Sequence, residues 1–275
     1  MSDSAQHGGA VAADWYELCD GWAPVQAEVI EEALVGIYVN GHELATIMCT
    51  PRDQVALALG FLKNEGRIES MDDVEATHLS QDGCCVDIWL RHAILPPKRV
   101  ILTSGCGGGV TFDDPASALP PLTEDIRVEP GRLVDLLNHL HDPGSLHART
   151  RGVHTAGLSD GSRLLARVED VGRHNTIDKL AGLCLLEGVE TRRRILLATG
   201  RVSSEMLRKA ALMRCPIVAS RNSPTSMSIA MARAWNITLV GYVRRESMRI
   251  YSHPERLGYR PKLAEAVLEQ AAHDA

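Results

Sequence analysis

Residues 177–243 constrain the fold more than any other part of the chain, because short apolar stretches alternate there with helical patterns. The first helical pattern places five side chains on one stripe: Ile177, Leu180, Ala181, Cys184 and Leu185. Three strands and two helices are then predicted in alternation. The strands cover residues 195–199, 216–220 and 237–243, and the helices cover residues 203–213 and 227–234. Ser223 and Pro224 are the predicted cap of the second of these helices. Such alternation with short connections predicts an α/β fold with parallel strands, right-handed crossovers and helices on the sheet faces.

Three polar clusters with arginines directly follow the three predicted strands, at residues 200–205, 220–223 and 244–247. Ligands of open α/β sheets bind at loops beyond the carboxyl ends of the strands. Gly200 permits a tight turn there, and Arg201 with the free N–H groups of a helix starting near Ser203 suits a phosphate. Helix capping explains Ser203 and Ser223 without a ligand, but three basic clusters on one edge together indicate an anion site.

Charge is distributed unevenly along this chain of 275 residues, whose net charge is −6. Residues 163–260 contain 18 Lys and Arg against 8 Asp and Glu, a balance of +10, so the rest of the chain carries −16. The later segment should attract anions. A solvated surface balanced by a dimer partner is the alternative. Nucleic acid is disfavoured, because the basic residues are not interleaved with aromatic side chains that stack on bases.

The first half of the chain has the pattern of a small α+β unit. Residues 33–48 predict a hairpin around Asn40 and Gly41. A helix should follow, with Thr50 as its cap, Pro51 at its first position and Gly66 at its end. Further strands are expected over residues 85–90 and 99–102, a linker over 113–125 and a helix over 130–140. These patterns predict two domains, residues 1–120 and residues 121–275.

One cysteine, Cys106, lies in the run Thr-Ser-Gly-Cys-Gly-Gly-Gly at residues 103–109. The four glycines remove side chains that would shield its sulfur, and successive backbone N–H groups in such a loop can favour the thiolate. The run therefore predicts a reactive thiol that a large partner can reach. A tight turn, or a phosphate-binding turn with an incidental cysteine, explains the same residues.

The remaining cysteines and the absence of targeting signals indicate a reducing compartment. The chain has seven cysteines without a regular framework, which is typical of the cytoplasm rather than of a disulfide scaffold. We expect Cys84 and Cys85 on opposite faces of a strand. Four cysteines in apolar surroundings are expected to be buried: Cys19, Cys49, Cys184 and Cys215. Residues 1–13 are small and polar without the segments of a secretion signal, and no stretch approaches the roughly 20 apolar residues of a membrane span. A cytoplasmic protein is therefore predicted.

Two polar motifs precede the α/β alternation, at residues 151–157 and 169–179. Because polar residues and glycines pack poorly in a hydrophobic core, a hydrogen-bonded site explains these two motifs better than core packing does. A capped turn with internal salt bridges is the alternative for the second motif. A lone histidine such as His154 is more often structural than catalytic.

Taken together, these motifs resemble the formate dehydrogenase accessory sulfurtransferases of FdhD type. The resemblance covers nearly the whole chain and rests on residues 50–62, 65–66, 103–109, 152–156, 169–175, 178–179, 200–205 and 241–244. It implies transfer of sulfur from a cysteine desulfurase to the molybdenum cofactor destined for formate dehydrogenase. It also implies a larger C-terminal domain with a cytidine-deaminase-like fold, a smaller α+β N-terminal domain, and a homodimer.

The resemblance further implies roles for particular residues. Cys106 would carry the sulfur as a persulfide, and the basic edge would hold bis-molybdopterin guanine dinucleotide as a bound substrate, with no tightly bound metal of the protein's own. The residues expected to contact this cofactor are Tyr242, Val243, Arg244, Arg245, Glu246, Ser247, Arg201, Arg173, His174 and His154. Many members have a second loop cysteine where this chain has Gly109, which puts in doubt a relay between two cysteines or a disulfide release of the sulfur.

Other functions explain fewer of these residues. Zinc deaminases need His-x-Glu and Pro-Cys-x-x-Cys motifs, but here His154 is followed by Thr155 and Ala156, and the sequence has no Cys-x-x-Cys. A thiol–disulfide oxidoreductase is disfavoured, because the loop of Cys106 has no partner cysteine. A non-catalytic chaperone that binds and inserts the molybdenum cofactor remains an alternative, because only the transferase needs a thiolate at Cys106. The expected partners are a cysteine desulfurase and the catalytic subunit of formate dehydrogenase, without nucleic acid or membrane, and the metal is molybdenum or tungsten.

Overall fold

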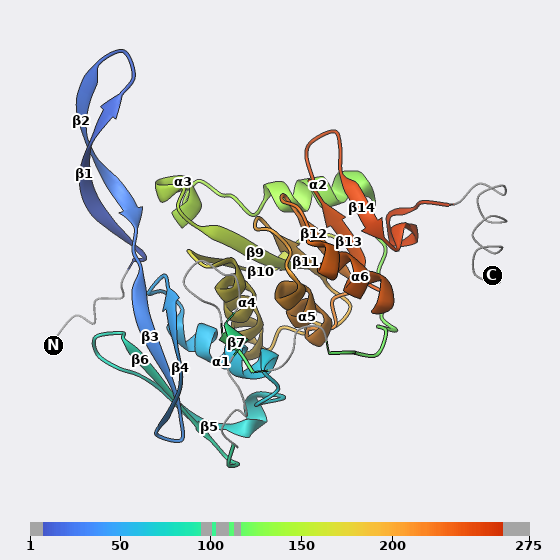
Figure 1. Ribbon diagram of the computed structural model, residues 1–275, viewed down its shortest axis with the longest axis horizontal. Helices are drawn as coiled ribbons and strands as arrows, with labels where there is room; N and C mark the ends of the chain where they lie inside the picture. Colours follow the sequence, from blue (N-terminus) through green and yellow to red (C-terminus); the bar gives the residue numbers. More distant parts are fainter. Residues whose placement is uncertain (1–7, 95–100, 103–109, 113–116, 261–275) are drawn as a thin grey trace.

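The computed structural model describes residues 8–94, 101–102, 110–112 and 117–260 (Figure 1). Cys106 and the glycine-rich run around it lie outside the described residues. No helix in the described part of the chain has the length and apolar character that crossing a membrane requires.

The larger sheet is mixed and has the strand order β10-β9-β11-β12-β13-β14. Its strands are β9 (His154–Ser159), β10 (Leu164–Asp170), β11 (Ile195–Ala198), β12 (Ile217–Ser220), β13 (Thr238–Gly241) and β14 (Arg249–Ser252). The neighbours β11, β12 and β13 are parallel, which confirms the prediction for these three strands. The prediction that residues 237–243 form the last strand was wrong, because β14 pairs antiparallel with β13 and turns residues 244–247 into a hairpin loop.

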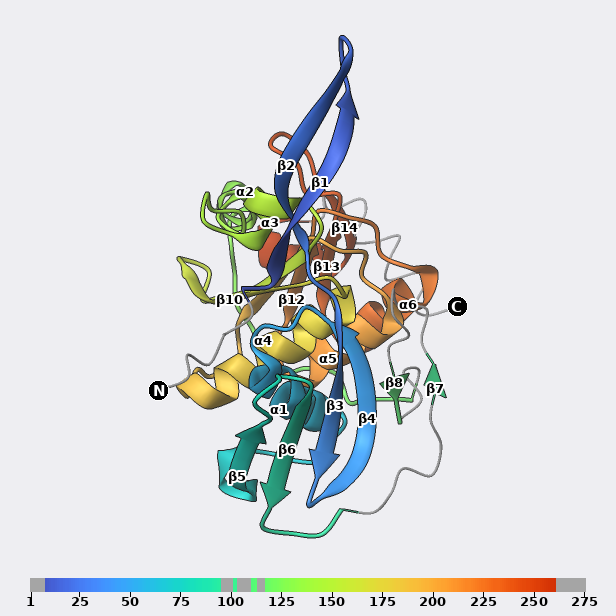
Figure 2. The ribbon, with the colours of Figure 1, turned by 90° about the vertical axis from the view of Figure 1, so that its left-hand side faces the viewer.

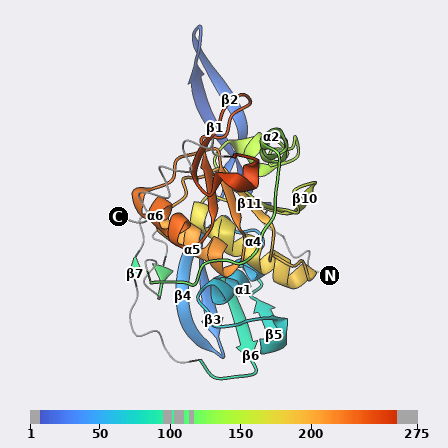
Figure 3. The ribbon, with the colours of Figure 1, turned by 90° about the vertical axis from the view of Figure 1, so that its right-hand side faces the viewer.

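Helices cover both faces of this sheet (Figure 3). One face packs on α4 (Arg173–Glu187), α5 (Ser204–Leu212) and α6 (Ser226–Ala234), and the other on α2 (Pro130–Asn138). Successive side chains of a strand alternate between the faces. Leu196 of β11 accordingly joins the core of α4 to α6, whereas Leu197 joins the core of α2. The short elements beside this layer are α3 (Leu146–Thr150) and the 3₁₀ helix η2 (Pro254–Leu257).

The smaller sheet has the order β4-β3-β6-β5 and packs on α1. Its elements are β3 (Ala33–Val39), β4 (His42–Cys49), α1 (Gln54–Asn64), the 3₁₀ helix η1 (Met71–Asp73), β5 (Val74–Leu79) and β6 (Cys85–Leu90). Asn40 and Gly41 form the turn between β3 and β4 with φ of 52° and 78°, as two-residue hairpins of this type require. A separate pair of short strands follows, β7 (Ile101–Leu102) and β8 (Val110–Thr111).

The two layers meet where α1 crosses α4, and α1 lies between the smaller sheet and α4 (Figure 2). Gly60 of α1 and Gly182 of α4 bring the two backbones into contact. A Cβ atom at Gly182 would lie 1.8 Å from the carbonyl oxygen of Ala56, and one at Gly60 would lie 1.7 Å from that of Asp178. Only glycine therefore fits at these two positions. The domain boundary at residue 120 and the cytidine-deaminase-like arrangement stay predictions.

An N-terminal hairpin, β1 (Ala10–Leu18) with β2 (Trp22–Ile30), extends away from the two layers (Figures 1 and 3). No pattern in the sequence predicted this hairpin. Its side chains are mostly exposed, so neither strand has the alternation of buried and exposed residues that reveals a strand in a sequence. Cys19, at the turn of this hairpin, is exposed, and the expectation of burial was wrong for it. The expectation was confirmed for Cys49, Cys184 and Cys215.

Two predicted helix caps were also wrong. Thr50 does not cap α1, which begins after Asp53 without a side-chain cap. Ser223 does not cap α6, whose cap is Thr225. Pro51 consequently precedes the first turn of α1 rather than occupying it. The predicted end of α1 was confirmed, because Gly66 follows its last residues with φ of 65°.

Candidate functional site

The polar clusters of the sequence converge at one edge of the larger sheet. The loops after the parallel strands β11, β12 and β13 leave this edge together. Because β9 runs antiparallel to β11, its first residue, His154, lies at the same edge. β10 ends there as well, with Asp170 opposite His154. The sheet topology therefore places loops from five strands at one side of the molecule.

Gly200, directly after β11, lets two basic side chains approach the start of its loop. A Cβ atom at Gly200 would lie 2.9 Å from Cβ of Arg173 and 3.3 Å from Nδ1 of His154. Burial, and then the charge of Arg173, lowers the pKa of His154. His154 is therefore neutral at pH 7, half-buried, and available as a hydrogen-bond partner at the edge.

Hydrogen bonds join the three loops to one another. Ser220 Oγ donates to the carbonyl oxygen of Gly200 over 2.6 Å. The backbone N–H of Val243 donates to the carbonyl of Ser220 over 3.1 Å, and that of Tyr242 donates to the carbonyl of Asn222 over 3.2 Å. The edge is thus one connected surface rather than three independent loops.

Positive charge is concentrated where the loops after β12 and β13 leave this edge. Arg244 Nη1 donates to the carbonyl oxygen of Arg221 over 2.6 Å, and Arg221 Nη2 donates to Oδ1 of Asn138 over 2.6 Å. Burial, and then the charge of Arg244, lowers the pKa of Arg221. His141 and His147 stack with their ring centroids 4.0 Å apart, and burial followed by the charge of His147 lowers the pKa of His141. A bound anion would relieve the repulsion between the guanidinium groups of Arg221 and Arg244.

The predicted contact residues differ in how a ligand can reach them. Five are exposed: Arg201, Arg244, Arg245, Glu246 and Ser247. Tyr242 is half-buried with φ of 52°, and the guanidinium of Arg249 lies 4.3 Å from its ring centroid. Val243 is fully buried in the core under α2, so its side chain shapes the loop and is not available to a ligand.

His174 and Arg173, at the start of α4, are both buried. His174 is turned toward α5, with Nε2 2.9 Å from Ser203 Oγ and 3.6 Å from Glu205 Oε2. Burial lowers the pKa of His174 to about 4, against the opposing effect of Glu205. The imidazole is neutral at pH 7 and holds the start of α5 in place from behind the edge.

Asp170 and Lys179 explain much of the polar motif at residues 169–179. The fully buried carboxylate of Asp170 pairs with Lys179 Nζ at 2.7 Å. It also accepts hydrogen bonds from the backbone N–H groups of Thr50 (3.1 Å) and Gly172 (2.7 Å) and from Asn175 Nδ2 (2.9 Å). This paired, fully hydrogen-bonded ion pair ties the end of β4 to β10 and α4. The internal salt-bridge alternative is thus correct for these two residues.

The described residues that flank the run around Cys106 are anchored to the end of α1. The carboxylate of Glu65 accepts hydrogen bonds from the backbone N–H of Phe112 (2.8 Å) and from Thr111 Oγ1 (3.2 Å). The ring of Phe112 packs edge-on against that of Phe61, with centroids 5.6 Å apart. Because β7 pairs with β8, the chain leaves and re-enters the described structure at one place.

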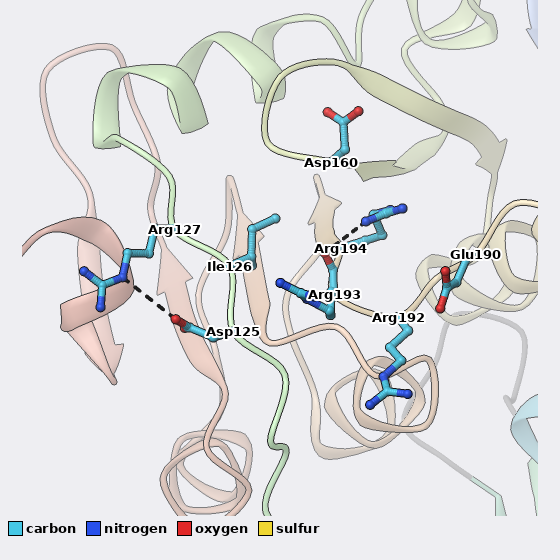
Figure 4. Close-up of a pocket in the computed structure, with 8 residues that line it drawn as sticks. All are labelled: Asp125, Ile126, Arg127, Asp160, Glu190, Arg192, Arg193 and Arg194. Atoms are coloured by element: carbon cyan, nitrogen blue, oxygen red, sulfur yellow. Dashed lines mark hydrogen bonds and ion pairs between the residues drawn. The ribbon is translucent and has the colours of Figure 1, made fainter.

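A hollow of about 830 Å³ lies at the opposite end of β11 (Figure 4). It is lined by Asp125, Ile126, Arg127, Asp160, Glu190, Arg192, Arg193 and Arg194. Its arginines are interspersed with acidic groups: Arg127 lies 3.8 Å from Asp125, and Arg192 donates to Glu124 over 2.8 Å. This hollow lacks the concentration of like charge seen at the carboxyl edge, so we take the edge as the candidate site.

Sequence reasoning missed several residues that the structure brings to this region. Arg221 lay in a cluster that was noted but was not assigned a role. Lys209 falls on the apolar face of its predicted helix, a position where a charged residue is itself a signal of a buried partner. Among the described residues, no three His, Cys, Asp or Glu side chains are grouped as metal ligands.

Comparisons with known proteins agree with this architecture. The FdhD/NarQ family pattern matches residues 30–258. The sulfur carrier protein FdhD of Staphylococcus aureus (strain MRSA252) is 33% identical over 238 residues, covering 84% of this chain and 89% of that protein. The protein of the same name from Staphylococcus haemolyticus (strain JCSC1435) is 34% identical over 236 residues, covering 83% and 89%.

A crystal structure described as a formate dehydrogenase accessory protein from Desulfotalea psychrophila superposes with a TM-score of 0.76. It is 26% identical in sequence, and the match covers 90% of this chain and 99% of that one. The mixed α/β architecture is thus shared with that protein. From the extent of the family match and the identity to these relatives, the chain belongs to the FdhD/NarQ family.

Proposed function

We propose that this protein is a sulfur carrier that loads sulfur on Cys106 and delivers it to a molybdenum or tungsten cofactor used by formate dehydrogenase. The observation that supports this most is the convergence of three arginine-bearing loops at one edge, in a chain whose relatives are named sulfur carrier proteins. The cofactor, bis-molybdopterin guanine dinucleotide, is the substrate of this reaction and not a resident group of the protein.

Loading requires one thiolate. Cys106 attacks the outer sulfur of a persulfide on a cysteine desulfurase, a new S–S bond forms on Cys106, and the S–S bond of the donor breaks. The desulfurase cysteine leaves as a thiolate. This exchange needs no second cysteine, so Gly109 is compatible with it.

Delivery breaks the S–S bond of the Cys106 persulfide. The outer sulfur passes to the metal as sulfide, and Cys106 returns as a thiolate. This release consumes two electrons, which we assign to the reduced metal of the substrate, whose oxidation state rises by two.

The edge supplies the donors that a dinucleotide substrate needs. Arg201 and Arg244 are exposed and can pair with phosphates, and the like charges of Arg221 and Arg244 favour an anion between them. His154 offers a neutral imidazole beside Gly200.

The test is intact mass after incubation with a cysteine desulfurase and cysteine. We expect wild-type protein to gain one sulfur that a reductant removes, and Cys106→Ala to gain none. Cys84→Ala is the matched control, because Cys84 is a free and exposed thiol. Loss of the sulfur in the Cys84 variant, or its retention in the Cys106 variant, would contradict the assignment.

A second experiment separates the delivery of sulfur to the cofactor from the loading of sulfur on Cys106. Arg201→Ala with Arg244→Ala should leave Cys106 loading unchanged and lower the formate dehydrogenase activity that the protein restores in cells lacking their own copy. If Cys106→Ala restored that activity as well as wild type, the non-catalytic cofactor chaperone would be the better account.

A further inference from the structure

Two histidines stack on each other at the edge of the larger sheet, with one nitrogen of each ring left unbonded. The rings of His141, which follows α2, and His147, in α3, have centroids 4.0 Å apart and planes inclined by 27°. Nδ1 of each ring is buried and has no hydrogen-bond partner among the residues that the structure describes. Because nearly all buried polar atoms are hydrogen-bonded, these two residues, here named the histidine pair, require a functional explanation.

Contacts on two sides place the histidine pair beside the arginine-bearing loops. The backbone N–H of His141 donates to the carbonyl of Asn138 over 3.3 Å, and Oδ1 of Asn138 accepts from Nη2 of Arg221 over 2.6 Å. The backbone N–H of His147 donates to Oε1 of Glu169, next to last in β10, over 3.0 Å. The histidine pair therefore lies between the loop after β12 and the end of β10.

The carboxylates near the histidine pair are already engaged by other groups. Glu169 accepts from two backbone N–H groups at the start of α3, and Asp142 pairs with Arg167. Within the described chain, Arg221 and Arg244 pair with no carboxylate, because their guanidinium groups donate to an amide oxygen and to backbone carbonyls. This end of the edge therefore holds positive charge that no described carboxylate neutralises.

The proton affinity of His141 depends on these charges. Burial first, and then the charges of His147, Arg221 and Arg151, lower the pKa of His141, whereas Glu169 opposes them. The imidazole is therefore neutral at pH 7 when no anion is bound. An opposite charge within about 4–6 Å shifts a pKa toward the charged form by about 1–3 units. An anion beside Arg221 therefore favours a proton on His141, and by linkage the proton favours the anion.

Charged and titratable groups face the histidine pair from each element around it. They are Asp142 after α2, Arg151 after α3, His154 in β9, Arg167 and Glu169 in β10, Arg221 after β12 and Arg244 after β13. Only two of these groups are acidic, and both are engaged as described above. The surroundings as a whole therefore favour an anion over a cation.

We propose that the histidine pair and Arg221 form a subsite for a phosphate or diphosphate group, and that this anion binds together with a proton. Its assignment to a phosphate of the cofactor rests on the proposed function, whereas the subsite itself does not. The proton adds to a ring nitrogen of the histidine pair and converts its lone pair into an N–H donor. One proton thus supplies a hydrogen bond and offsets part of the charge of the anion.

The first test measures the affinity for inorganic pyrophosphate by titration calorimetry at pH 6 and pH 8. We expect binding to tighten between pH 8 and pH 6 at least about threefold more in wild type than in the double variant His141→Gln with His147→Gln. The protonation of pyrophosphate itself is common to both proteins and cancels in this ratio. His139→Gln is the matched control, because His139 is exposed and lies two residues from His141. It should behave as wild type.

Arginine variants locate the anion. Arg221→Ala should weaken pyrophosphate binding at least about tenfold at both pH values, because it removes a charged hydrogen-bond donor. Arg193→Ala is the matched control: it removes an exposed arginine from the hollow at the opposite end of β11 and should change the affinity by less than about twofold.

The second test needs no variant and uses sulfate, a dianion that does not titrate between pH 5 and 8. Imidazole resonances of wild type are followed by NMR through a pH titration in sodium sulfate and in sodium chloride of equal ionic strength. We expect sulfate to raise the pKa of His141 by at least about half a unit. An equal titration of His141 in both salts would overturn the proposal.

Two calorimetric results would also overturn the subsite. One is wild-type protein that does not bind pyrophosphate, and the other is the same pH dependence in wild type and in the double variant. If the double variant does not fold, which thermal unfolding shows, the sulfate titration of wild type decides.

Failure of the subsite is distinct from failure of the proposed function. If wild-type protein gained no sulfur from an active desulfurase but bound pyrophosphate together with a proton, the sulfur carrier proposal would fall and the subsite would stand. If wild type gained sulfur but bound pyrophosphate independently of the histidine pair, only the subsite would be refuted.

Discussion

Replacing Gly182 by alanine tests the helix crossing that joins the two layers. The added Cβ would lie 1.8 Å from the carbonyl oxygen of Ala56 and 2.8 Å from the backbone nitrogen of Gly60. Unbonded heavy atoms keep about 3.5 Å apart, so α1 and α4 must separate by well over ~1 Å. Backbone atoms cannot turn aside as a side chain would, so the contact can be relieved only by moving a helix.

Two effects oppose each other in this variant. Alanine favours a helix over glycine by about 0.8–1.0 kcal/mol. Overpacking of a core costs about 1–3 kcal/mol and occasionally more, and a backbone clash belongs at the upper end. We therefore expect Gly182→Ala to lose about 2 kcal/mol of unfolding free energy, which lowers Tm by about 4–8 °C.

The assay is urea and thermal unfolding of four variants: Gly182→Ala, Gly60→Ala, the double variant and a control. Gly131→Ala in α2 is the matched control, because a Cβ there meets nothing within 4 Å, and it should gain about 0.4–1 kcal/mol. Gly60→Ala with Gly182→Ala should cost less than the two single losses added, since one separation of the helices relieves both clashes. Unchanged or increased stability of Gly182→Ala would refute the backbone contact.

Two further predictions concern buried ionisable groups. Asp170→Asn leaves the fully buried ammonium of Lys179 without its counter-charge, so we expect a loss of about 3–5 kcal/mol in urea unfolding; a loss below about 1 kcal/mol would contradict this. His174→Gln should flatten the acid side of the stability curve. Between pH 6.5 and about 4 the unfolded chain binds a proton that buried His174 does not, so the wild type loses up to about 3 kcal/mol as the pH falls. Unfolding at pH 7, 5.5 and 4.5 measures the difference, and parallel curves for variant and wild type would refute it.

Local patterns accounted for much of the fold. The hairpin at Asn40 and Gly41, the end of α1 at Gly66, and the parallel strands β11 to β13 all follow from residues close together in the sequence. The convergence of the arginine-bearing clusters also followed, because parallel strands must present their carboxyl ends at one edge. The roles of Cys106 and of the contact residues stay predictions.

Elements without a local signal were missed or misplaced. Most side chains of β1 and β2 are exposed, so these strands show no alternation of buried and exposed residues. The strand β14 has only four residues and runs antiparallel to β13. Thr50 was expected to cap a helix, as its local sequence suggests. The side-chain oxygen that would cap a helix binds a distant partner instead: Thr50 Oγ1 accepts a hydrogen bond from the backbone N–H of Val171, 121 residues away.

The sequence by itself determined the parallel strands β11 to β13 with the helices between them, and which edge of these strands carries the arginine-bearing clusters, because periodicity and charge are properties of neighbouring residues. Only the tertiary structure decided the contact of Gly60 with Gly182, the pairing of Asp170 with Lys179, and the pairing of Lys209 with Asp178 and Glu205. These features join residues from different elements. Their energies come from burial and from close approach, which exist only once the chain has packed.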